Sequence, residues 1–74
     1  MSKSIGFIGG GAMATGIIKG ILSANTLTSE EIYVKELLPE RQVYLKETYG
    51  LQLADSLKEL AEKAKVLVLA VRPQ

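Results

Sequence analysis

The residues best suited to chemistry form a glycine-rich stretch near the N-terminus, Gly9-Gly10-Gly11-Ala12-Met13-Ala14, which has the spacing G-x-G-x-x-A. In this spacing the first glycine allows a tight turn after a strand, and the second lets a phosphate approach the backbone. The final small residue lets the following helix pack closely on the strand. Backbone N–H groups around Ala12 and Met13 then point towards the phosphates. The stretch therefore predicts a loop that binds the pyrophosphate of a dinucleotide.

An acidic residue at a suitable distance supports this prediction. Glu36 lies 22 positions after Ala14, and the acidic ribose ligand of such sites is expected about 20 residues beyond the glycine motif. Glu36 can accept a hydrogen bond from a free 2′-hydroxyl, which favours NADH, whereas a 2′-phosphate would bring like charges together. Lys35 can offset part of that repulsion, and Arg41 is a second cation that a phosphate could meet. Glu36 therefore makes NAD(H) a candidate cofactor.

Strands and helices must alternate to bring these residues together. Short apolar runs predict strands at 4–8, 32–35, 51–53 and 66–71. Apolar residues spaced three and four apart, Pro39 as a first helical residue and Gly50 as a stop signal predict helices at 12–24 and 39–48. A third helix is expected from a cap at Asp55 or Ser56 to about Lys63. The alternation predicts an α/β fold of the Rossmann type, with a parallel sheet of strand order 3-2-1-4 and helices on both faces.

Three features of these elements predict their packing. The run from Val66 to Val71 is continuously apolar, which is typical of a strand buried on both faces. Gly16 and Gly20 lie four residues apart, which would let the first helix approach another backbone closely. The apolar stripe of that helix predicts its buried residues, which are Met13, Ile17, Ile18, Ile21 and Leu22.

The composition argues against several classes of function. The chain has 74 residues, enough for one small domain, and a net charge of +1 with basic and acidic residues intermixed. This pattern argues against a nucleic-acid partner, and the apolar segments are too short for a membrane span or a signal peptide. The chain contains no cysteine or histidine, which removes thiol nucleophiles, imidazole bases and the usual zinc ligands. The sequence therefore nominates no catalytic or metal-binding residue, and it predicts a cytoplasmic protein.

Three segments, IGFIGGGAMATGIIKGIL, EIYV and VLAVRPQ, together resemble the N-terminal domain of the pyrroline-5-carboxylate reductase family. The resemblance covers essentially the whole chain. It implies that residues 1–74 are an NAD(P)-binding Rossmann domain of an enzyme that reduces 1-pyrroline-5-carboxylate to L-proline by hydride transfer, usually with NADP(H). Within the domain, the resemblance implies that the glycine motif binds the pyrophosphate and that Lys35 and Glu36 lie near the adenosine ribose. It also implies a loop beside the cofactor formed by Ala70, Val71, Arg72 and Pro73.

The same resemblance predicts what the 74 residues lack. The chain stops just after an apolar strand, so we expect an N-terminal fragment without the C-terminal domain that supplies the imine pocket and the dimer interface. Alone, the chain should bind cofactor weakly and should not reduce the imine. The full enzyme should be a homo-oligomer, and the exposed edge of 66–71 should let the fragment self-associate.

Some positions depart from the family pattern. Ala12 and Leu57 stand where the family usually has asparagine, and Arg72 stands where it usually has lysine. Two alternatives therefore remain open. One is a non-enzymatic nucleotide-binding module, such as a late-competence protein related to this reductase. The other is the cofactor domain of a hydroxyacid-dehydrogenase-like oxidoreductase.

Overall fold

Strands and helices alternate along the chain in the order that the sequence predicts. The structure, a computed structural model, describes residues 4–9 and 11–69. The elements are β1 (Ile5–Ile8), α1 (Ala12–Ser23), the short 3₁₀ helix η1 (Ser29–Glu31), β2 (Ile32–Lys35), α2 (Pro39–Tyr49), β3 (Gln52–Leu53), α3 (Leu57–Lys63) and β4 (Val66–Leu69).

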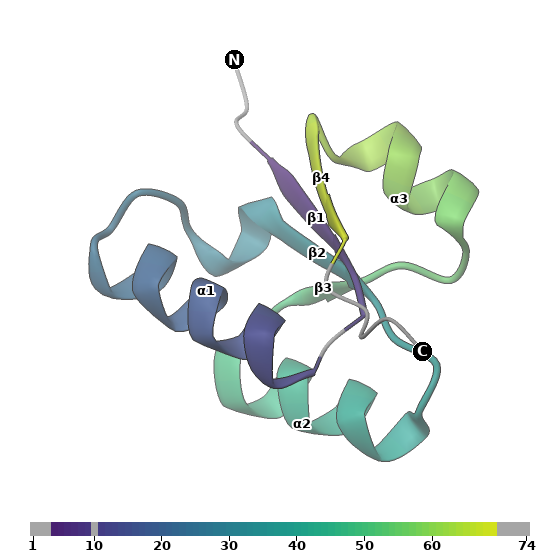
Figure 1. The fold of residues 1–74 in the computed structure, drawn as a ribbon, viewed down its shortest axis with the longest axis horizontal. Helices are drawn as coiled ribbons and strands as arrows, with labels where there is room; N and C mark the ends of the chain where they lie inside the picture. The colour runs from purple at the N-terminus through teal and green to yellow at the C-terminus, as the bar shows by residue number, and fades with distance from the viewer. Residues whose placement is uncertain (1–3, 10, 70–74) are drawn as a thin grey trace.

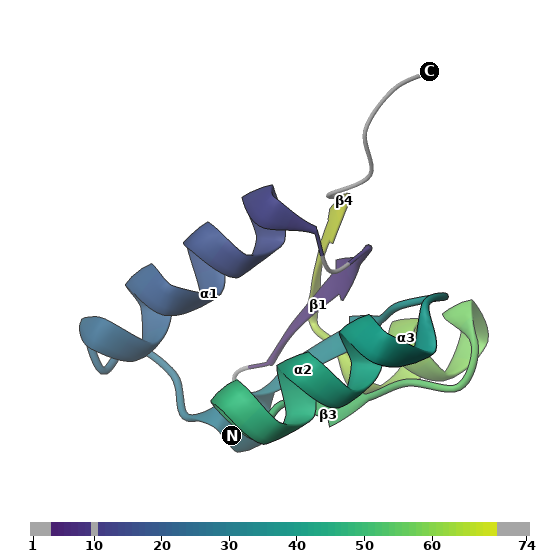
Figure 2. The ribbon, with the colours of Figure 1, turned by 90° about the horizontal axis from the view of Figure 1, so that it is seen from below.

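The four strands form one parallel sheet in the order β3-β2-β1-β4. Figures 1 and 2 show α1 and α2 together on one side of this sheet and α3 on the other. The predicted strand order, parallel pairing and helices on both faces are therefore confirmed. In this order β2 and β3 lie on one side of β1, and the chain then crosses to the other side of β1 to form β4. Ligands of open α/β sheets bind at the carboxyl ends of strands at such a reversal.

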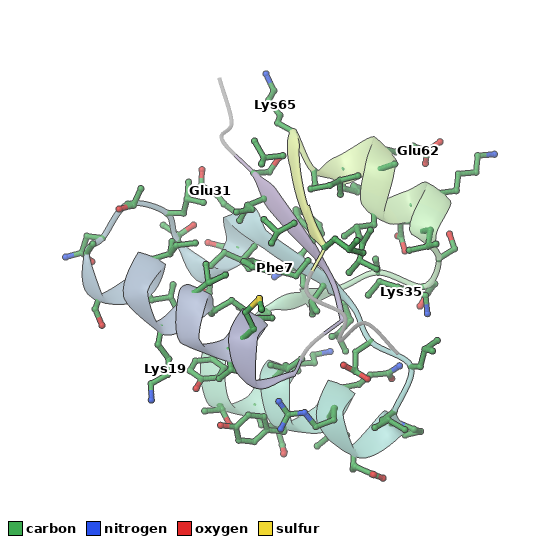
Figure 3. All side chains as sticks on the ribbon, viewed as in Figure 1. Phe7, Lys19, Glu31, Lys35, Glu62 and Lys65 are labelled. Atoms are coloured by element: carbon green, nitrogen blue, oxygen red, sulfur yellow. The ribbon has the colours of Figure 1, made fainter. Side chains whose placement is uncertain are left out.

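Successive residues of β1 pack on the helices on the two faces of the sheet. Phe7 is fully buried and packs in one cluster with Ala14 and Ile18 of α1 and Leu45 of α2. Figure 3 shows Phe7 between the sheet and α1. Neighbouring residues on a strand point to opposite faces, so Gly6 faces α3, where a Cβ would lie only 2.8 Å from Leu60 Cδ1. Both layers of helices therefore pack directly on the central strand.

The helix ends follow local sequence signals. Pro39 begins α2, and Gly50 ends it in the left-handed region at φ 70°. Of the two predicted caps for α3, Ser56 is the one used, since its Oγ accepts a hydrogen bond from Glu59 N at 3.1 Å.

Two packing predictions for α1 are wrong. Met13 is 65% exposed, because the buried face of α1 is centred on Ala14 and Ile18, and Met13 lies about 100° away from Ala14 around the helix. Ile17 is exposed for the same reason, although Ile18 is buried as predicted. Gly16 and Gly20 allow no close approach within the described part of the chain, since a Cβ on either would meet nothing there within 4 Å.

The prediction that the last strand is buried on both faces is also wrong for β4. Leu69 is 68% exposed, and Val66 and Leu67 are exposed as well. The reason is topological: α3 packs on β1 and β2, which leaves the faces of the outer strand β4 less covered. Within residues 4–9 and 11–69 no strand pairs with the outer edge of β4. The last two residues of the predicted strand, Ala70 and Val71, lie outside the described residues. Self-association through this edge stays a prediction.

A buried serine ties the start of β1 to the turn between α3 and β4. Ser4 is 8% exposed; its Oγ donates to Lys63 O at 2.9 Å and accepts from Lys65 N at 3.0 Å. We expect Ser4→Ala to lower the free energy of unfolding by about 1 kcal/mol, because the carbonyl of Lys63 loses this partner. Urea denaturation measures the change, and an unaltered midpoint would show that water replaces the hydroxyl.

Candidate functional site

The turn after β1 has the backbone geometry that the glycine motif requires. Gly9 has φ 98°, a conformation that favours glycine, and its N–H donates to Lys35 O at 2.9 Å. Gly11 is the N-cap of α1 at φ −77°, which other residues also adopt. Among the described residues, a Cβ on Gly11 would meet nothing within 4 Å. The first glycine therefore serves the turn, whereas the second leaves open the space in front of the helix.

The start of α1 is placed to receive an anion in that space. Ala14 is fully buried, so the helix packs closely on the strand, as the motif predicts. Gly11 offers no side chain to cap the helix, and its carbonyl accepts the helical bond from Thr15 N at 3.0 Å. The N–H groups of a helix's first turn have no acceptor within the helix, which makes this end suitable for an anion.

The turn between β2 and α2 forms the part of the site that contains Glu36. A Glu36 carboxylate oxygen accepts from Leu38 N at 3.0 Å, and the Glu36 carbonyl accepts from Gln42 Nε2 at 2.6 Å. These two bonds fix the turn between β2 and α2. Next to it lies a cavity of about 320 Å³, and its lining residues are Ile8, Gly9, Lys35, Glu36, Leu37 and Leu57. The structure therefore brings the first glycine together with the predicted ribose-binding residues.

A second cavity, of about 370 Å³, lies between α1 and α2 and is lined by Gly11, Thr15, Gly16, Lys19, Arg41 and Tyr44. Arg41 Nη2 donates to Thr15 Oγ1 at 3.3 Å, and Thr15 Oγ1 donates to the Gly11 carbonyl at 2.9 Å. Figure 3 shows Lys19 extending from α1 on the side of α2. Lys19 and Arg41 therefore line the same cavity as Gly11.

Two tyrosines of α2 form a ring pair beside Arg41. The rings of Tyr44 and Tyr49 meet edge to face, with centroids 6.0 Å apart, and Arg41 Cζ lies 4.9 Å from the centroid of Tyr44. A hydrogen bond with Tyr44 raises the pKa of Tyr49 above its ordinary value of 10.0; desolvation adds to the rise, and Arg41 opposes it. Tyr49 is therefore neutral at physiological pH and adds no negative charge near Arg41.

The predicted site residues fall into three groups. Gly9, Gly11, Lys35 and Glu36 line the two cavities. Ala12, Met13 and Ala14 form the first turn of α1, where Met13 is exposed and Ala14 is buried, and neither of these two lines a cavity. The remaining predicted site residues Gly10, Ala70, Val71, Arg72 and Pro73 lie outside the described residues.

Seven cavity-lining residues were not predicted as site residues from the sequence: Ile8, Thr15, Gly16, Lys19, Leu37, Tyr44 and Leu57. Thr15 and Lys19 had a usable signal. They lie four residues apart just after the glycine motif, a spacing that places them on one face of the helix.

Two other kinds of feature, a metal-binding cluster and a membrane-spanning helix, are absent from residues 4–9 and 11–69. No three or more acidic, histidine or cysteine side chains gather there in a way that could hold a metal ion. Among the helices of this described part, none has the length and apolar character needed to cross a membrane.

Comparisons with known proteins agree with this geometry. Residues 4–74 match the family model described as NADP oxidoreductase, coenzyme F420-dependent. The chain is 40% identical over 74 residues to a pyrroline-5-carboxylate reductase from Synechocystis sp., covering 100% of this chain and 28% of the relative. It is 33% identical over 73 residues to the Escherichia coli protein of the same name, covering 99% of this chain and 27% of that one.

A solved structure gives the same result. A pyrroline-5-carboxylate reductase from Coxiella burnetii superposes with a TM-score of 0.86 at 34% identity, over 99% of this chain and 27% of the other. The chain thus spans just over a quarter of the length of these relatives, and the resemblance found in its sequence is confirmed. It belongs to the NADP oxidoreductase, coenzyme F420-dependent family, and it is similar over essentially its whole length to pyrroline-5-carboxylate reductases.

Proposed function

We propose that residues 1–74 are the nicotinamide-dinucleotide-binding domain of a reductase that converts 1-pyrroline-5-carboxylate to L-proline. The observation that carries the proposal is the open space at Gly11, which lies between a strand end and the start of α1. A cofactor in this site supplies the hydride. The chain's own residues bind and orient the cofactor, and none of them is assigned as a catalytic acid or base.

The pyrophosphate and the adenosine half of the cofactor each have a counterpart in the site. The pyrophosphate fits the space in front of Gly11, where the first-turn N–H groups of α1 can donate to its oxygens. The adenosine ribose fits the cavity beside Lys35 and Glu36, whose other lining residues are mostly apolar and suit a base. The pyrophosphate and ribose positions are adjacent, because Gly9 donates to Lys35 across β1 and β2.

Opposing charges bear on the choice between NADPH and NADH. Glu36 can accept from a free ribose 2′-hydroxyl, but it repels a 2′-phosphate, whereas Arg41 attracts one. We infer that NADH binds no more than about tenfold more weakly than NADPH, which is roughly 1.4 kcal/mol.

Glu36→Ser should shift the preference towards NADPH, because it removes the carboxylate that repels the 2′-phosphate while leaving a hydroxyl that can hydrogen-bond. At about 4 Å and an effective dielectric near 20, one such charge pair is worth up to ~4 kcal/mol before screening by solvent. The ratio of the dissociation constants of NADPH and NADH measures the shift. A ratio equal to that of the wild type would mean that Glu36 does not face the ribose.

The proposal as a whole is tested by titrating NADPH and NADH into the whole protein and following the nicotinamide fluorescence. We expect saturable binding of at least one of them, together with NAD(P)H oxidation that depends on added 1-pyrroline-5-carboxylate. Absence of binding by both would leave only the fold. Binding without imine-dependent oxidation would reject the assigned substrate.

A further inference from the structure

We propose that Thr15 is a positioning residue: it holds Arg41 beside the glycine turn and thereby sets how well the site distinguishes NADPH from NADH. The inference rests on the proposed binding of a nicotinamide dinucleotide. It concerns a side chain that lies just beyond the glycine motif and is not part of it.

The hydrogen bonds of Thr15 give its hydroxyl a defined direction. A hydroxyl has one proton to donate and lone pairs to accept. The Thr15 proton is directed to the carbonyl of Gly11 at 2.9 Å, so a lone pair is left to accept from Arg41 Nη2 at 3.3 Å. Thr15 thus connects the N-cap of α1 to a guanidinium that comes from α2.

Arg41 is also held from its own helix. Its Cζ lies 4.9 Å from the centroid of the Tyr44 ring, within the range of a cation–π contact. A long side chain that is fixed on two sides has less freedom to lose when a ligand binds. The contact with Thr15 is part-buried, so it is partly shielded from competing water.

The cavity beside Arg41 has the charge that a phosphate needs. Its described lining residues include two cations, Lys19 and Arg41, and no carboxylate. The planar guanidinium offers several N–H donors, so it can bind phosphate while one N–H stays on Thr15.

The position of Arg41 in the chain indicates which phosphate this is. Arg41 belongs to α2, which begins three residues after Glu36, the predicted ribose ligand. NADPH differs from NADH by a phosphate on this ribose, and an arginine near the end of the second strand accommodates it in Rossmann folds. Glu36 lines the cavity at Gly9, and Arg41 lines the cavity at Gly11. A 2′-phosphate that extends from the first cavity towards the second would be repelled by Glu36 and attracted by Arg41.

The test compares Thr15→Val with Thr15→Ser in the whole protein, using NADPH and NADH as probes in fluorescence titrations. Thr15→Val keeps the shape of the side chain and removes both hydrogen bonds, so NADPH binding should weaken about tenfold, while NADH binding changes less than about twofold. Thr15→Ser keeps the hydroxyl and should restore the wild-type preference. Arg41→Gln should reproduce the selective loss of NADPH binding with a larger effect.

Three outcomes would overturn the inference. Equal weakening of both cofactors by Thr15→Val would place its effect on the pyrophosphate loop. Unchanged NADPH affinity in Arg41→Gln would show that no phosphate meets this guanidinium. A Thr15→Ser variant that behaves like Thr15→Val would mean that the hydroxyl of Thr15 does not determine the preference for NADPH. A wild-type protein that binds neither cofactor rejects the proposed function itself, and this is seen before any variant is compared.

Discussion

A valine in place of Gly11 should abolish the binding of NADPH and NADH while leaving the fold in place. The fold should survive because Gly11 has an ordinary backbone conformation, φ −77°, and an added Cβ would meet no atom of residues 4–9 and 11–69 within 4 Å. Valine is a poorer N-cap than glycine, so a stability loss of about 1 kcal/mol or less is expected. Binding should be lost because the branched side chain fills the space that the pyrophosphate must enter to reach the first-turn N–H groups.

The matched control for this substitution is Gly20→Val. Gly20 lies in the helix that Gly11 precedes, is exposed and lines neither cavity, and no described residue lies within 4 Å of where its Cβ would be. The control variant should bind both cofactors as the wild type does. Titration of both variants, with circular dichroism to confirm the helix content, measures the contrast. If Gly11→Val kept the wild-type affinity, the glycines would serve only the turn, and the proposed pyrophosphate site would be rejected.

Local signals are sufficient to predict the elements of the fold. The sequence predicts the second strand at 32–35, where β2 is found, because its β-branched and aromatic residues lie between polar segments. Gly50 ends α2 at a positive φ that favours glycine. The strand order also follows, since alternating strands and helices in a short chain allow few arrangements of a parallel sheet.

Burial is harder to predict, because it depends on what covers each face. Met13 and Ile18 are both apolar residues of α1, yet only Ile18 faces the sheet. The sequence of β4 is apolar throughout, as in a central strand, but β4 is an outer strand of this sheet. The apolar run therefore predicts that a strand forms there, but it does not predict how far the strand is buried.

The site also has features that the local sequence predicts and contacts that it does not predict. The roles of Gly9 and Gly11 depend on backbone conformation and on missing side chains, which a short motif encodes directly. The contact between Arg41 and Thr15 joins residues 26 positions apart and exists only because α1 and α2 lie on the same side of the sheet (Figure 1). Nothing in the local sequence around either residue indicates the other.

The largest effect on stability is expected at Gly6, where alanine should lower the free energy of unfolding by about 1–3 kcal/mol. The Cβ of that alanine would lie 2.8 Å from both Ala64 Cβ and Leu60 Cδ1. The Leu60 side chain is fully packed, and a Cβ such as that of Ala64 moves only with its backbone, so α3 would have to shift away from the sheet. Chemical denaturation of the variant and the wild type measures the difference.

The sign of this effect is informative, because the same substitution should have the opposite effect at Gly20. Alanine is favoured over glycine inside a helix by about 0.5–1 kcal/mol, and Gly20 has open space for the added methyl group. Gly20→Ala should therefore stabilise the protein while Gly6→Ala destabilises it. If both variants were stabilised, the entropy of the unfolded chain would outweigh the contact between β1 and α3. That result would mean that α3 does not pack on the sheet as closely as the 2.8 Å approach requires.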